Sequence, residues 1–296
     1  MLRGFLCRGV FGTLLALCAN VAFAFPLVIA QVSDRPKKDF KQLRPMVEYM
    51  AQQLAPYGVT SGSVRLYDSL DKLVVAVRSG EVHWVTETGY SAAVLVHEAN
   101  ASLLAHKWKG GKQSYQSVIY THKDSGVKTI NDLVGKVMAF EHNTSFSSYY
   151  LPRNALEKEG LRFAPLVNHQ APVPEGQVGF VFSRNEKNNA LWTDKQLVAA
   201  GVLNDGDWEN PKRVPPEIKK NLNVIYRSPL YPRALELGSP TLPAPLATAL
   251  SQALLSLNEE NAKKLLKAYE KTTKFQAIGE DVPSLLSDIY TSSRSW

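Results

Sequence analysis

The chain has 296 residues, of which 45% are hydrophobic, so it is long enough to bury a large core and to form two lobes. Its formal net charge is +7, but the basic residues are scattered along the sequence instead of forming one basic stretch with interleaved aromatic residues. This distribution favours anions weakly and argues against a nucleic-acid partner.

The first 24 residues have the pattern of a secretory signal peptide. A basic start at Arg3 and Arg8 precedes an apolar run to Phe25, which contains the small-residue site Ala22-Phe23-Ala24. The run is shorter than the about 20 apolar residues that a membrane-spanning helix needs. We therefore expect export, with cleavage after Ala24.

Both cysteines, Cys7 and Cys18, lie in this segment. We expect a mature chain without a disulfide, a thiolate metal site or a cysteine nucleophile. A lipid anchor on Cys18 is an alternative, which the large Leu17 before it disfavours. No later stretch is apolar enough to cross a bilayer, so the pattern predicts a soluble exported protein.

Strands and helices alternate in the first block of the expected mature chain. Strand patterns at 26–30, 64–67 and 82–85 are interleaved with predicted helices over 40–54, from a cap at Asp68 or Ser69 to Ser79, and over 91–98. This order favours a mostly parallel sheet covered by helices, whose ligands gather where strands end and helices begin. Those places are 33–35, 67–69, 86–91 and, further along the chain, 144–148.

A second α/β block follows the glycines at 110 and 111. We predict strands at 117–121, 137–140, 178–182, 202–203 and 223–227, a polar turn at 183–189, and helices over 149–159, 191–200, 246–257 and 261–271. Because the chain leaves the first block near Tyr120 and returns near Ile225, we expect two lobes joined by a hinge. Lobe 1 would comprise 25–118 and 226–296, and lobe 2 would comprise 119–225.

The stretch from Val137 to Pro152 combines a buried strand, a polar turn and a helix start. The first N–H groups of a helix have no partner inside it and carry a partial positive charge, so an anion can bind there. Four hydroxyl side chains gather at this point: Thr144, Ser145, Ser147 and Ser148. They either donate to an anion or merely cap the helix.

Three ordered segments of the chain resemble the periplasmic phosphonate-, phosphite- and phosphate-binding components of ABC importers. They are residues 115–119, 124–136 and 145–152, and weaker similarity covers most of the mature chain. The resemblance implies the two-lobed type II periplasmic binding fold, an α/β fold in which each lobe is a mostly parallel sheet flanked by helices, with two hinge crossings. It also implies a periplasmic location.

In that family a Ser-Thr-Ser-Gly turn holds the oxyanion of the ligand, and it corresponds here to Ser145, Phe146, Ser147 and Ser148. Phe146 replaces a hydroxyl and Ser148 replaces a glycine. The resemblance therefore implies the binding of an oxyanion or a carboxylate more strongly than that of phosphonate itself.

From the first lobe, Tyr67 and Tyr90 resemble the family's aromatic positions and, with Thr88, would close over the ligand. Each tyrosine is alternatively a packed core or rim residue. The family also holds a ligand amine with His and acidic residues. No histidine stands at the matching turn, 183–186, and Asn204 or Asp205 would take the acidic place.

A hydrolase site can be assembled on paper from Ser147, His142 and Asp124, or from Glu87 and Glu141. The serine lacks a Gly-x-Ser-x-Gly elbow, and His142 is only five residues before it on the same turn. The six histidines have no His-x-x-x-His or His-x-His spacing. We expect neither an enzyme nor a metal site, and no cofactor.

Together these patterns predict a periplasmic solute-binding protein that closes two lobes on a small anionic ligand. The expected partner is the membrane permease of an ABC importer, and the alternative is a sensor that passes its ligand-bound shape to a membrane receptor kinase. We expect a monomer. The sequence leaves open whether the ligand is phosphate, phosphite, a phosphonate, another oxyanion or a carboxylated metabolite.

Overall fold

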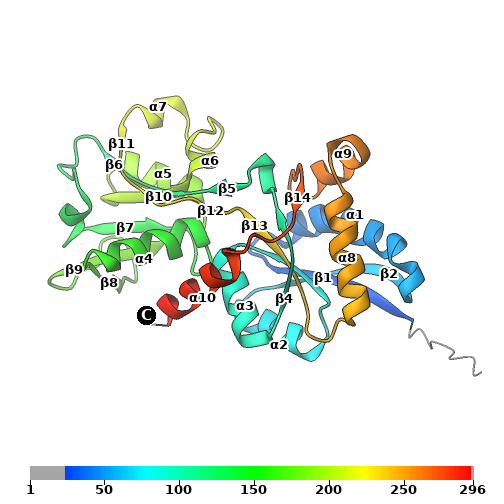
Figure 1. Cartoon of the computed structure of the whole chain (residues 1–296). Coiled ribbons are helices and arrows are strands. Elements are labelled where there is room, and N and C mark those ends of the chain that lie inside the picture. The colour runs from blue at the N-terminus through cyan, green and yellow to red at the C-terminus, as the bar shows by residue number, and fades with distance from the viewer. Residues whose placement is uncertain (1–23, 295–296) are drawn as a thin grey trace, which may run out of the picture.

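The computed structural model describes residues 24–294, which form two six-stranded sheets joined by a small two-stranded sheet (Figure 1). Residues 1–23, with most of the predicted signal peptide and both cysteines, lie outside the described part of the chain. Among residues 24–294, no helix is both long and apolar enough to span a membrane.

The first sheet has the strand order β14-β4-β13-β3-β1-β2. Its strands are β1 (Phe25–Val32), β2 (Val59–Tyr67), β3 (Trp84–Glu87), β4 (Ser102–Lys107), β13 (Ala234–Gly238) and β14 (Phe275–Gln276). Strands β13 and β14 run antiparallel to their neighbours, whereas β1 pairs in parallel with β2 and β3. The sheet is therefore mixed, with most strands pointing the same way.

Helices cover both faces of the first sheet. They are α1 (Pro36–Gln53), α2 (Leu70–Ser79), α3 (Gly89–Ala99), α8 (Ala244–Ser256), α9 (Glu259–Ala268) and α10 (Val282–Ser293). One apolar cluster joins α2, α3 and α10 to the sheet, and another joins α1, α8 and α9 to it. Strand β2 lies so close to α1 that a Cβ on Gly62 would stand 2.4 Å from the Val47 carbonyl oxygen, which explains the glycine there.

The second sheet has the strand order β11-β6-β10-β7-β9-β8. Its strands are β6 (Ser117–His122), β7 (Val137–Phe140), β8 (Arg162–Pro165), β9 (Gln177–Phe182), β10 (Ala200–Asn204) and β11 (Leu222–Arg227). Its helices are α4 (Leu151–Lys158), α5 (Glu186–Asp194), α6 (Asp205–Trp208) and α7 (Pro216–Lys219). Only β6 runs against its neighbours among these strands.

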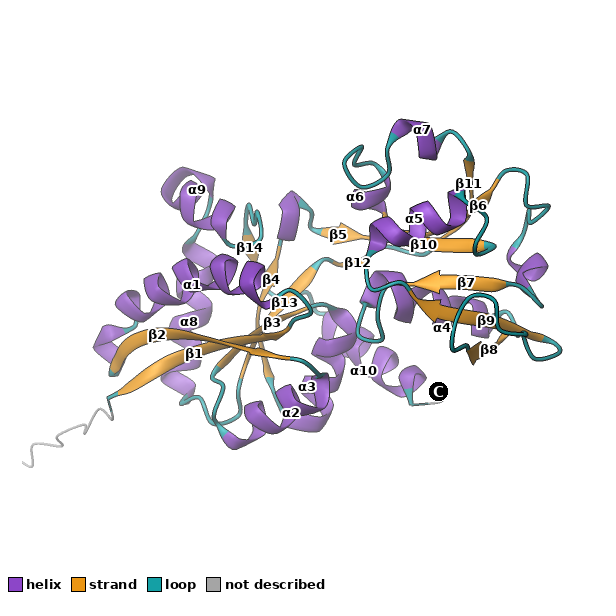
Figure 2. Ribbon diagram, turned by 180° about the vertical axis from the view of Figure 1, so that it is seen from behind, coloured by secondary structure: helices purple, strands orange, loops and turns teal. Residues whose placement is uncertain are grey.

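Two extended segments connect the sheets. They are β5 (Ser114–Tyr115) and β12 (Tyr231–Pro232), which pair antiparallel and lie between the two large sheets (Figure 2). The predicted lobe boundaries, at 118/119 and 225/226, fall inside β6 and β11. The division into two hinged lobes stays a prediction, and we use lobe 1 and lobe 2 below for the elements of the first and second sheets.

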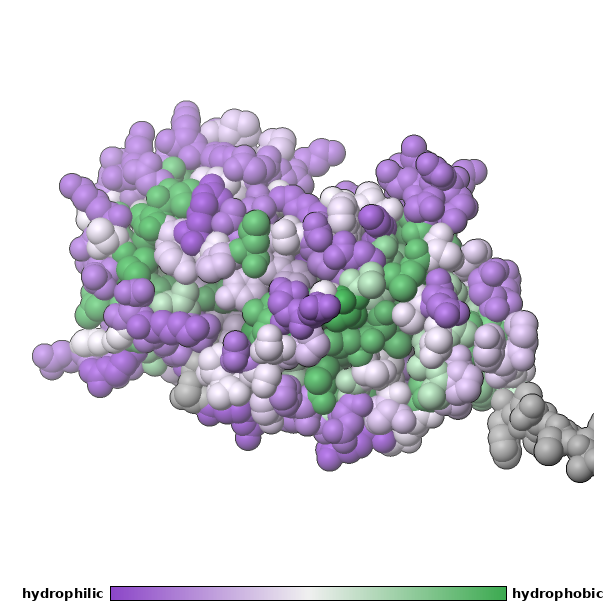
Figure 3. Space-filling view, viewed as in Figure 1, coloured by the Kyte–Doolittle hydropathy of each residue, from purple (hydrophilic) through white to green (hydrophobic). Residues whose placement is uncertain are grey.

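Four short helical turns complete the described part of the chain: η1 (Ala55–Tyr57), η2 (Lys109–Gly111), η3 (Ile130–Leu133) and η4 (Phe146–Tyr150). The last of these is a wide turn that leads directly into α4 (Figure 1). The helix predicted over 149–159 therefore begins earlier, as η4, and α4 ends at Lys158. In the view of Figure 3 the surface is mainly hydrophilic, and apolar residues gather beside α8, on the side where β4 and β13 lie in Figure 1.

Local signals place several elements correctly. Helix α2 begins after Ser69, whose hydroxyl accepts the Lys72 N–H, and ends at Gly80 with a φ of 79°. The helix predicted over 191–200 exists, but its predicted bounds are wrong, as is the predicted extension of the polar turn to 189. Asn185 accepts the Lys187 N–H, so α5 begins at Glu186, and residues 200–204 form the buried strand β10.

Candidate functional site

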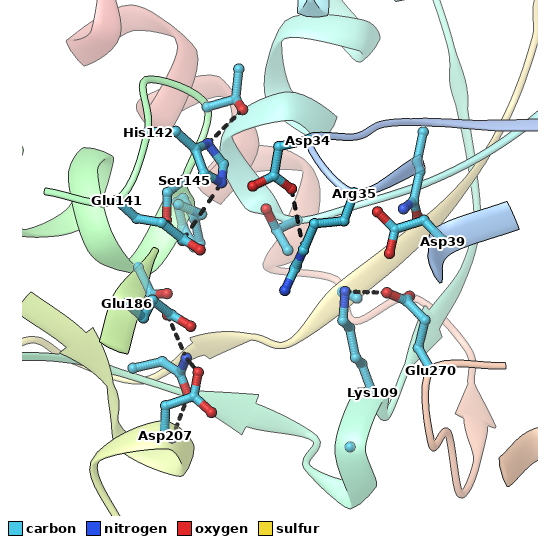
Figure 4. A pocket seen from close by; sticks show the side chains of 18 of the residues that line it. Asp34, Arg35, Asp39, Lys109, Glu141, His142, Ser145, Glu186, Asp207 and Glu270 are labelled. Carbon is cyan, nitrogen blue, oxygen red and sulfur yellow. Dashed lines mark hydrogen bonds and ion pairs between the residues drawn. The ribbon is translucent and has the colours of Figure 1, made fainter. Parts of the chain in front are cut away.

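A cavity of about 910 Å³ lies between the two sheets (Figure 4). Lobe 1 contributes the loop after β1 and the loop between β3 and α3. Lobe 2 contributes the turn after β7, the start of α5 and the region of α6. The connecting segments contribute Tyr115 and Arg233. The cavity therefore lies where strands end and helices begin, as the sequence predicts for such sheets.

Hydroxyl groups from three parts of the chain meet at one end of this cavity. Burial raises the pKa of Tyr115 to about 12, while the charge of Arg233 and the hydroxyls of Ser147 and Thr88 act in the opposite direction. Ser147 belongs to η4, Thr88 precedes α3, and Tyr115 lies on β5. Uncharged donors from both lobes and from a connecting strand thus lie close together.

The polar turn before η4 adopts the capped form that the sequence allowed. The Ser145 hydroxyl accepts the Ser148 N–H at 3.2 Å and donates to Glu141 at 3.0 Å. The Thr144 hydroxyl is 3.0 Å from Nδ1 of His142. Since the first N–H groups of a helical turn have no partner inside it, those at the start of η4 are donors near the cavity.

The structure places the predicted site residues in two groups. Six line the cavity: Thr144, Ser145, Phe146, Ser147, Thr88 and Asn204. Four do not: Ser148, Tyr67, Tyr90 and Asp205.

Each of these four has another partner. The buried Ser148 hydroxyl donates to the Val202 carbonyl oxygen at 3.0 Å, and Tyr67 donates to Glu81 at 2.9 Å. Tyr90 stacks on Tyr150, with 5.4 Å between ring centroids. Asp205 accepts from the Lys112 ammonium group at 2.7 Å.

Phe146 is an interlobe contact residue. Its side chain is 2% exposed and belongs to the same apolar cluster as the residues of α2, α3 and α10. A Cβ built on Gly89 would lie 2.7 Å from the Phe146 ring, so the start of α3 approaches that ring closely. The ring also stacks on Tyr150 and meets Tyr231 edge-on, with 5.5 and 5.4 Å between centroids.

Carboxylates of lobe 2 line another part of the cavity (Figure 4). The Asn204 amide donates to Glu186 and to Asp207, at 3.0 Å each. Burial, followed by the charge of Glu141 and the contact with Asp207, raises the pKa of Glu186 well above its ordinary value. Burial acts to raise the pKa of Asp207 too, but Glu186, Arg213 and Asn204 outweigh it and lower that pKa. A proton shared between these two carboxyl groups therefore resides mainly on Glu186.

Cationic side chains face these carboxylates. Arg35 precedes α1 and points into the cavity (Figure 4). Burial acts to lower its pKa, but Asp34, Asp39 and, across the cavity, Glu141 and Glu186 raise it above the ordinary value. The Lys109 ammonium group is 2.5 Å from a carboxylate oxygen of Glu270. The cavity thus holds both signs of charge, which suits a ligand that is not uniformly charged.

Several residues that line the cavity were not predicted from the sequence as ligand-binding residues. They are Arg35, Tyr115, Glu186, Asp207 and Arg233. Tyr115 falls in a segment that carries the family resemblance, and Glu186 in the turn compared with the family's histidine, so both had a weak signal. Arg35 lies in the stretch 33–35, where the sequence predicts that ligands gather, whereas Asp207 and Arg233 belong to no motif and only the fold brings them to the cavity.

Glu87 gives the cavity a group that titrates near neutral pH. Burial raises its pKa from 4.5 to about 7, against the Val32 and Thr88 N–H groups and the charge of Lys109, which act to lower it. A raised pKa means that the folded state holds the proton more tightly. The contribution of Glu87 to stability is therefore complete below pH 4.5 and is lost as the pH rises through about 7.

Between pH 4.5 and about 7, we expect the free energy of unfolding to fall less in Glu87→Gln than in the wild type. The difference is expected to be on the order of 3 kcal/mol. Urea unfolding at both pH values measures it. Glu280→Gln, an exposed control outside the cavity, should keep the wild-type dependence. Equal curves for Glu87→Gln and the wild type would contradict the assignment of this titration to Glu87.

Within residues 24–294, no cluster of three or more His, Cys, Asp or Glu side chains has an arrangement that could hold a metal ion. The geometry does not support the hydrolase sites that could be assembled from the sequence. His142 contacts Thr144 and Glu141, not Ser147, in the hydrogen bonds and ion pairs of the described chain. The Ser147 hydroxyl instead lies beside Tyr115.

Comparison with known proteins shows the family. The family model of the periplasmic phosphonate substrate-binding proteins of ABC transporters matches residues 29–282. This confirms the resemblance seen in the sequence. No curated protein sequence matches the chain.

Solved structures share the fold at low sequence identity. XAC2383 from Xanthomonas citri, solved with chloride and with ATP, has a TM-score of 0.86 at 24% and 23% identity, covering 91% of this chain and 97% of that one. PhnD1 from Prochlorococcus marinus, in complex with methylphosphonate, has a TM-score of 0.68 at 16% identity and the same coverage.

A binding protein component of an ABC phosphonate transporter, PA3383 from Pseudomonas aeruginosa, has a TM-score of 0.65 at 20% identity, covering 91% of this chain and 87% of that one. These shared folds and the two mainly parallel sheets flanked by helices confirm the predicted α/β fold class.

Proposed function

Because the chain belongs to the family of periplasmic substrate-binding proteins of ABC phosphonate transporters, we propose that it binds a small anionic ligand in the cavity between its two lobes. One observation carries this proposal: Ser147 of lobe 2, Thr88 of lobe 1 and Tyr115 of a connecting strand bring their hydroxyls together at one end of the cavity. An oxyanion there accepts hydrogen bonds from both lobes at once. A ligand that contacts both lobes favours the state in which they are close together.

The anionic end of the ligand would contact Ser147 and the backbone N–H groups at the start of η4, while Ser145, whose hydroxyl proton is donated to Glu141, caps this turn. Hydrogen bonds to a charged group are the strong ones, and donors that are already in place need little reorganisation. The four predicted residues outside the cavity lining have no place in this proposal. Phe146 contributes its backbone, because its ring is buried against Gly89 and Tyr150.

The carboxyl groups of Glu141, Glu186 and Asp207 support a second feature of the ligand, a cationic group. A bound ammonium group would favour ionisation of Glu186, whose proton the neighbouring carboxylates otherwise retain. Phosphonates with an amine, such as aminoethylphosphonate, combine both features. Methylphosphonate, bound by PhnD1, and ATP, bound by XAC2383, belong in the same screen because the cavity of about 910 Å³ exceeds the size of a simple oxyanion.

We propose that the protein works in the periplasm after removal of its signal peptide and delivers its ligand to the permease of an ABC importer. The second candidate is a sensor that passes its bound shape to a receptor kinase. Copurification from membranes distinguishes them: recovery of a permease supports import, and recovery of a kinase supports sensing.

Calorimetry of the chain from Phe25 onward tests the proposed ligand class. Inorganic phosphate, phosphite, methylphosphonate, aminoethylphosphonate, sulfate, small carboxylates and ATP form the panel. A ligand at about a hundred times its Kd should stabilise the native state by about 2.7 kcal/mol, so thermal shifts select the titrations to run. If ligand-free protein binds no anion of this panel, the proposed ligand class is wrong.

For the anion that binds best, Ser147→Ala is expected to weaken binding by several-fold to about tenfold, because one hydrogen bond to a charged group is lost. Ser63→Ala is the matched control, since Ser63 is exposed on β2 and lies outside the cavity lining. Calorimetric titration of both variants gives the two ratios. Unchanged affinity of Ser147→Ala would show that this hydroxyl serves only local structure.

A further inference from the structure

Arg233 occupies a position in the cavity that no sequence motif marks. It follows β12, and its N–H donates to the Gln113 carbonyl oxygen at 2.9 Å, which fixes the backbone there. Its guanidinium carbon lies 4.3 Å from the ring centroid of Tyr115. The Tyr115 hydroxyl in turn lies beside Ser147 and Thr88. The guanidinium group is therefore next to the hydroxyl-lined end of the cavity.

Arg233 differs from the other cations of this cavity in its burial and its partners. Lys109, Lys112 and Arg213 have carboxylates at 2.5, 2.7 and 3.4 Å, and Arg35 pairs with Asp34. Among residues 24–294, the lining cations without an ion pair include five that are exposed to solvent: Lys38, Arg184, Lys187, Lys212 and Lys271. Arg233 is half-buried and, within that same range, no carboxylate forms an ion pair with it.

A half-buried charge without a close counter-charge is unfavourable. Among the groups that lower the pKa of Asp207, Arg233 has the smallest effect. This fits a charge that attracts the carboxylate from beyond ion-pair distance. The Tyr115 ring compensates part of the lost hydration by a cation–π contact. A guanidinium group stacked on a ring keeps its in-plane N–H donors available, and their fork matches two oxygens of one oxyanion.

We infer that Arg233 is the ionic partner of the anionic group of the ligand, which we assign to the phosphorus oxyanions, phosphate or phosphonate. This inference rests on the proposed function and deepens it. The anion site then consists of neutral donors from both lobes and one positive charge on a connecting segment. That charge acts on the ligand without belonging to either moving lobe.

The test uses Arg233→Gln and Arg233→Lys, titrated by calorimetry with inorganic phosphate and methylphosphonate at low and at high salt. Arg233→Gln is expected to weaken binding by about 10- to 100-fold, because a charge-assisted bidentate contact is lost. Arg233→Lys should fall between it and the wild type, since it keeps the charge and loses the fork. Arg227→Gln, which removes an exposed arginine outside the cavity lining, should stay within about twofold.

The melting temperature without ligand separates a binding role from a structural one. Removing an unpaired half-buried charge should leave the stability of ligand-free Arg233→Gln unchanged or increased. Wild-type affinity in Arg233→Gln overturns the inference and leaves the proposed function intact. Failure of the wild type to bind either probe overturns the inference, and failure with every anion of the panel also overturns the proposed function. Should Arg233→Gln fail to fold, wild-type affinity in Arg233→Lys still overturns the bidentate contact.

Discussion

Replacing Lys107 with methionine is expected to lower the free energy of unfolding by about 3–5 kcal/mol, because two buried carboxylates lose the cation they share. The Lys107 ammonium group lies 2.7 Å from an oxygen of Glu270 and 3.3 Å from one of Glu236. Lys107 and Glu236 have exposed side-chain fractions of 0%. Burial acts to lower the pKa of Lys107, but these carboxylates outweigh it and raise that pKa.

The rest of the network makes the loss hard to absorb. Glu236 accepts hydrogen bonds from the Trp84 indole at 2.6 Å, from Tyr269 at 3.0 and 3.1 Å, and from Thr86 at 3.1 Å. These donors and Lys107 favour the ionised carboxylate, but burial outweighs them and raises the pKa of Glu236, so removing Lys107 takes away the only charge that offsets its burial among the groups that act on this pKa. The change also removes the hydrogen bond from Lys107 to Thr86 and its contact with the Tyr269 ring.

Urea unfolding of Lys107→Met and Lys109→Met measures this prediction. Lys109 pairs with the same Glu270, but its side chain is 29% exposed. We expect its removal to cost at most about 1 kcal/mol, as for other solvent-accessible pairs. Equal losses in the two variants would show that burial of the Lys107 network does not determine its contribution.

Phe146→Ala is expected to lower the free energy of unfolding by about 3–5 kcal/mol, the usual range for a buried phenylalanine. It should also let the two lobes separate. The ring packs against Gly89 of lobe 1 and Tyr231 of the connecting strand β12, although it belongs to η4 of lobe 2. The same contact is supported by Tyr150, whose hydroxyl donates to the Ile289 carbonyl oxygen of α10 at 3.0 Å.

Small-angle scattering measures the separation as an increase in the radius of gyration. Phe163→Ala is the matched control, because the Phe163 ring packs on Phe140 and Phe180 within lobe 2. It should reduce stability without changing the radius. An unchanged radius in Phe146→Ala would mean that this ring does not hold the lobes together.

Gly89→Ala probes the same contact from the other side. Its methyl group would lie 2.7 and 2.8 Å from carbons of the Phe146 ring, which is tighter than real contacts allow. The change should therefore be costly in the wild type and nearly neutral in Phe146→Ala, which no longer has the ring. A double-mutant cycle in urea measures this coupling. Additive losses would contradict direct contact between the two positions.

The hydroxyl-rich turn at 144–148 and much of the α/β pattern were predictable because each depends on residues that are neighbours in the sequence. The Ser69 cap, the Gly80 end of α2 and the apolar run of β7 are local signals. The polar turn after β7 was marked by four hydroxyls within five residues, and it lies at the cavity. Such features depend on backbone geometry over one or two turns, so a single segment contains the information.

Strands β4 and β13 were missed for the opposite reason. Lys107 ends β4 and Glu236 lies in the middle of β13. A charged residue in such a pattern predicts an exposed position as long as its partner is unknown. Lys107 stands 129 residues before Glu236 and 163 residues before Glu270 in the chain. Only the sheet, in which β13 pairs with β4, brings the first two together.

The candidate site divides in the same way. The sequence by itself determined the family, the fold class and the hydroxyl-rich helix start, because each follows from a continuous motif. The tertiary structure alone decided that Phe146 packs between the lobes, that the Asn204 amide joins Glu186 to Asp207, and that Arg233 is half-buried with no ion pair among residues 24–294. Burial and the absence of a counter-charge are properties of an environment built by distant segments, and no single stretch of sequence contains that environment.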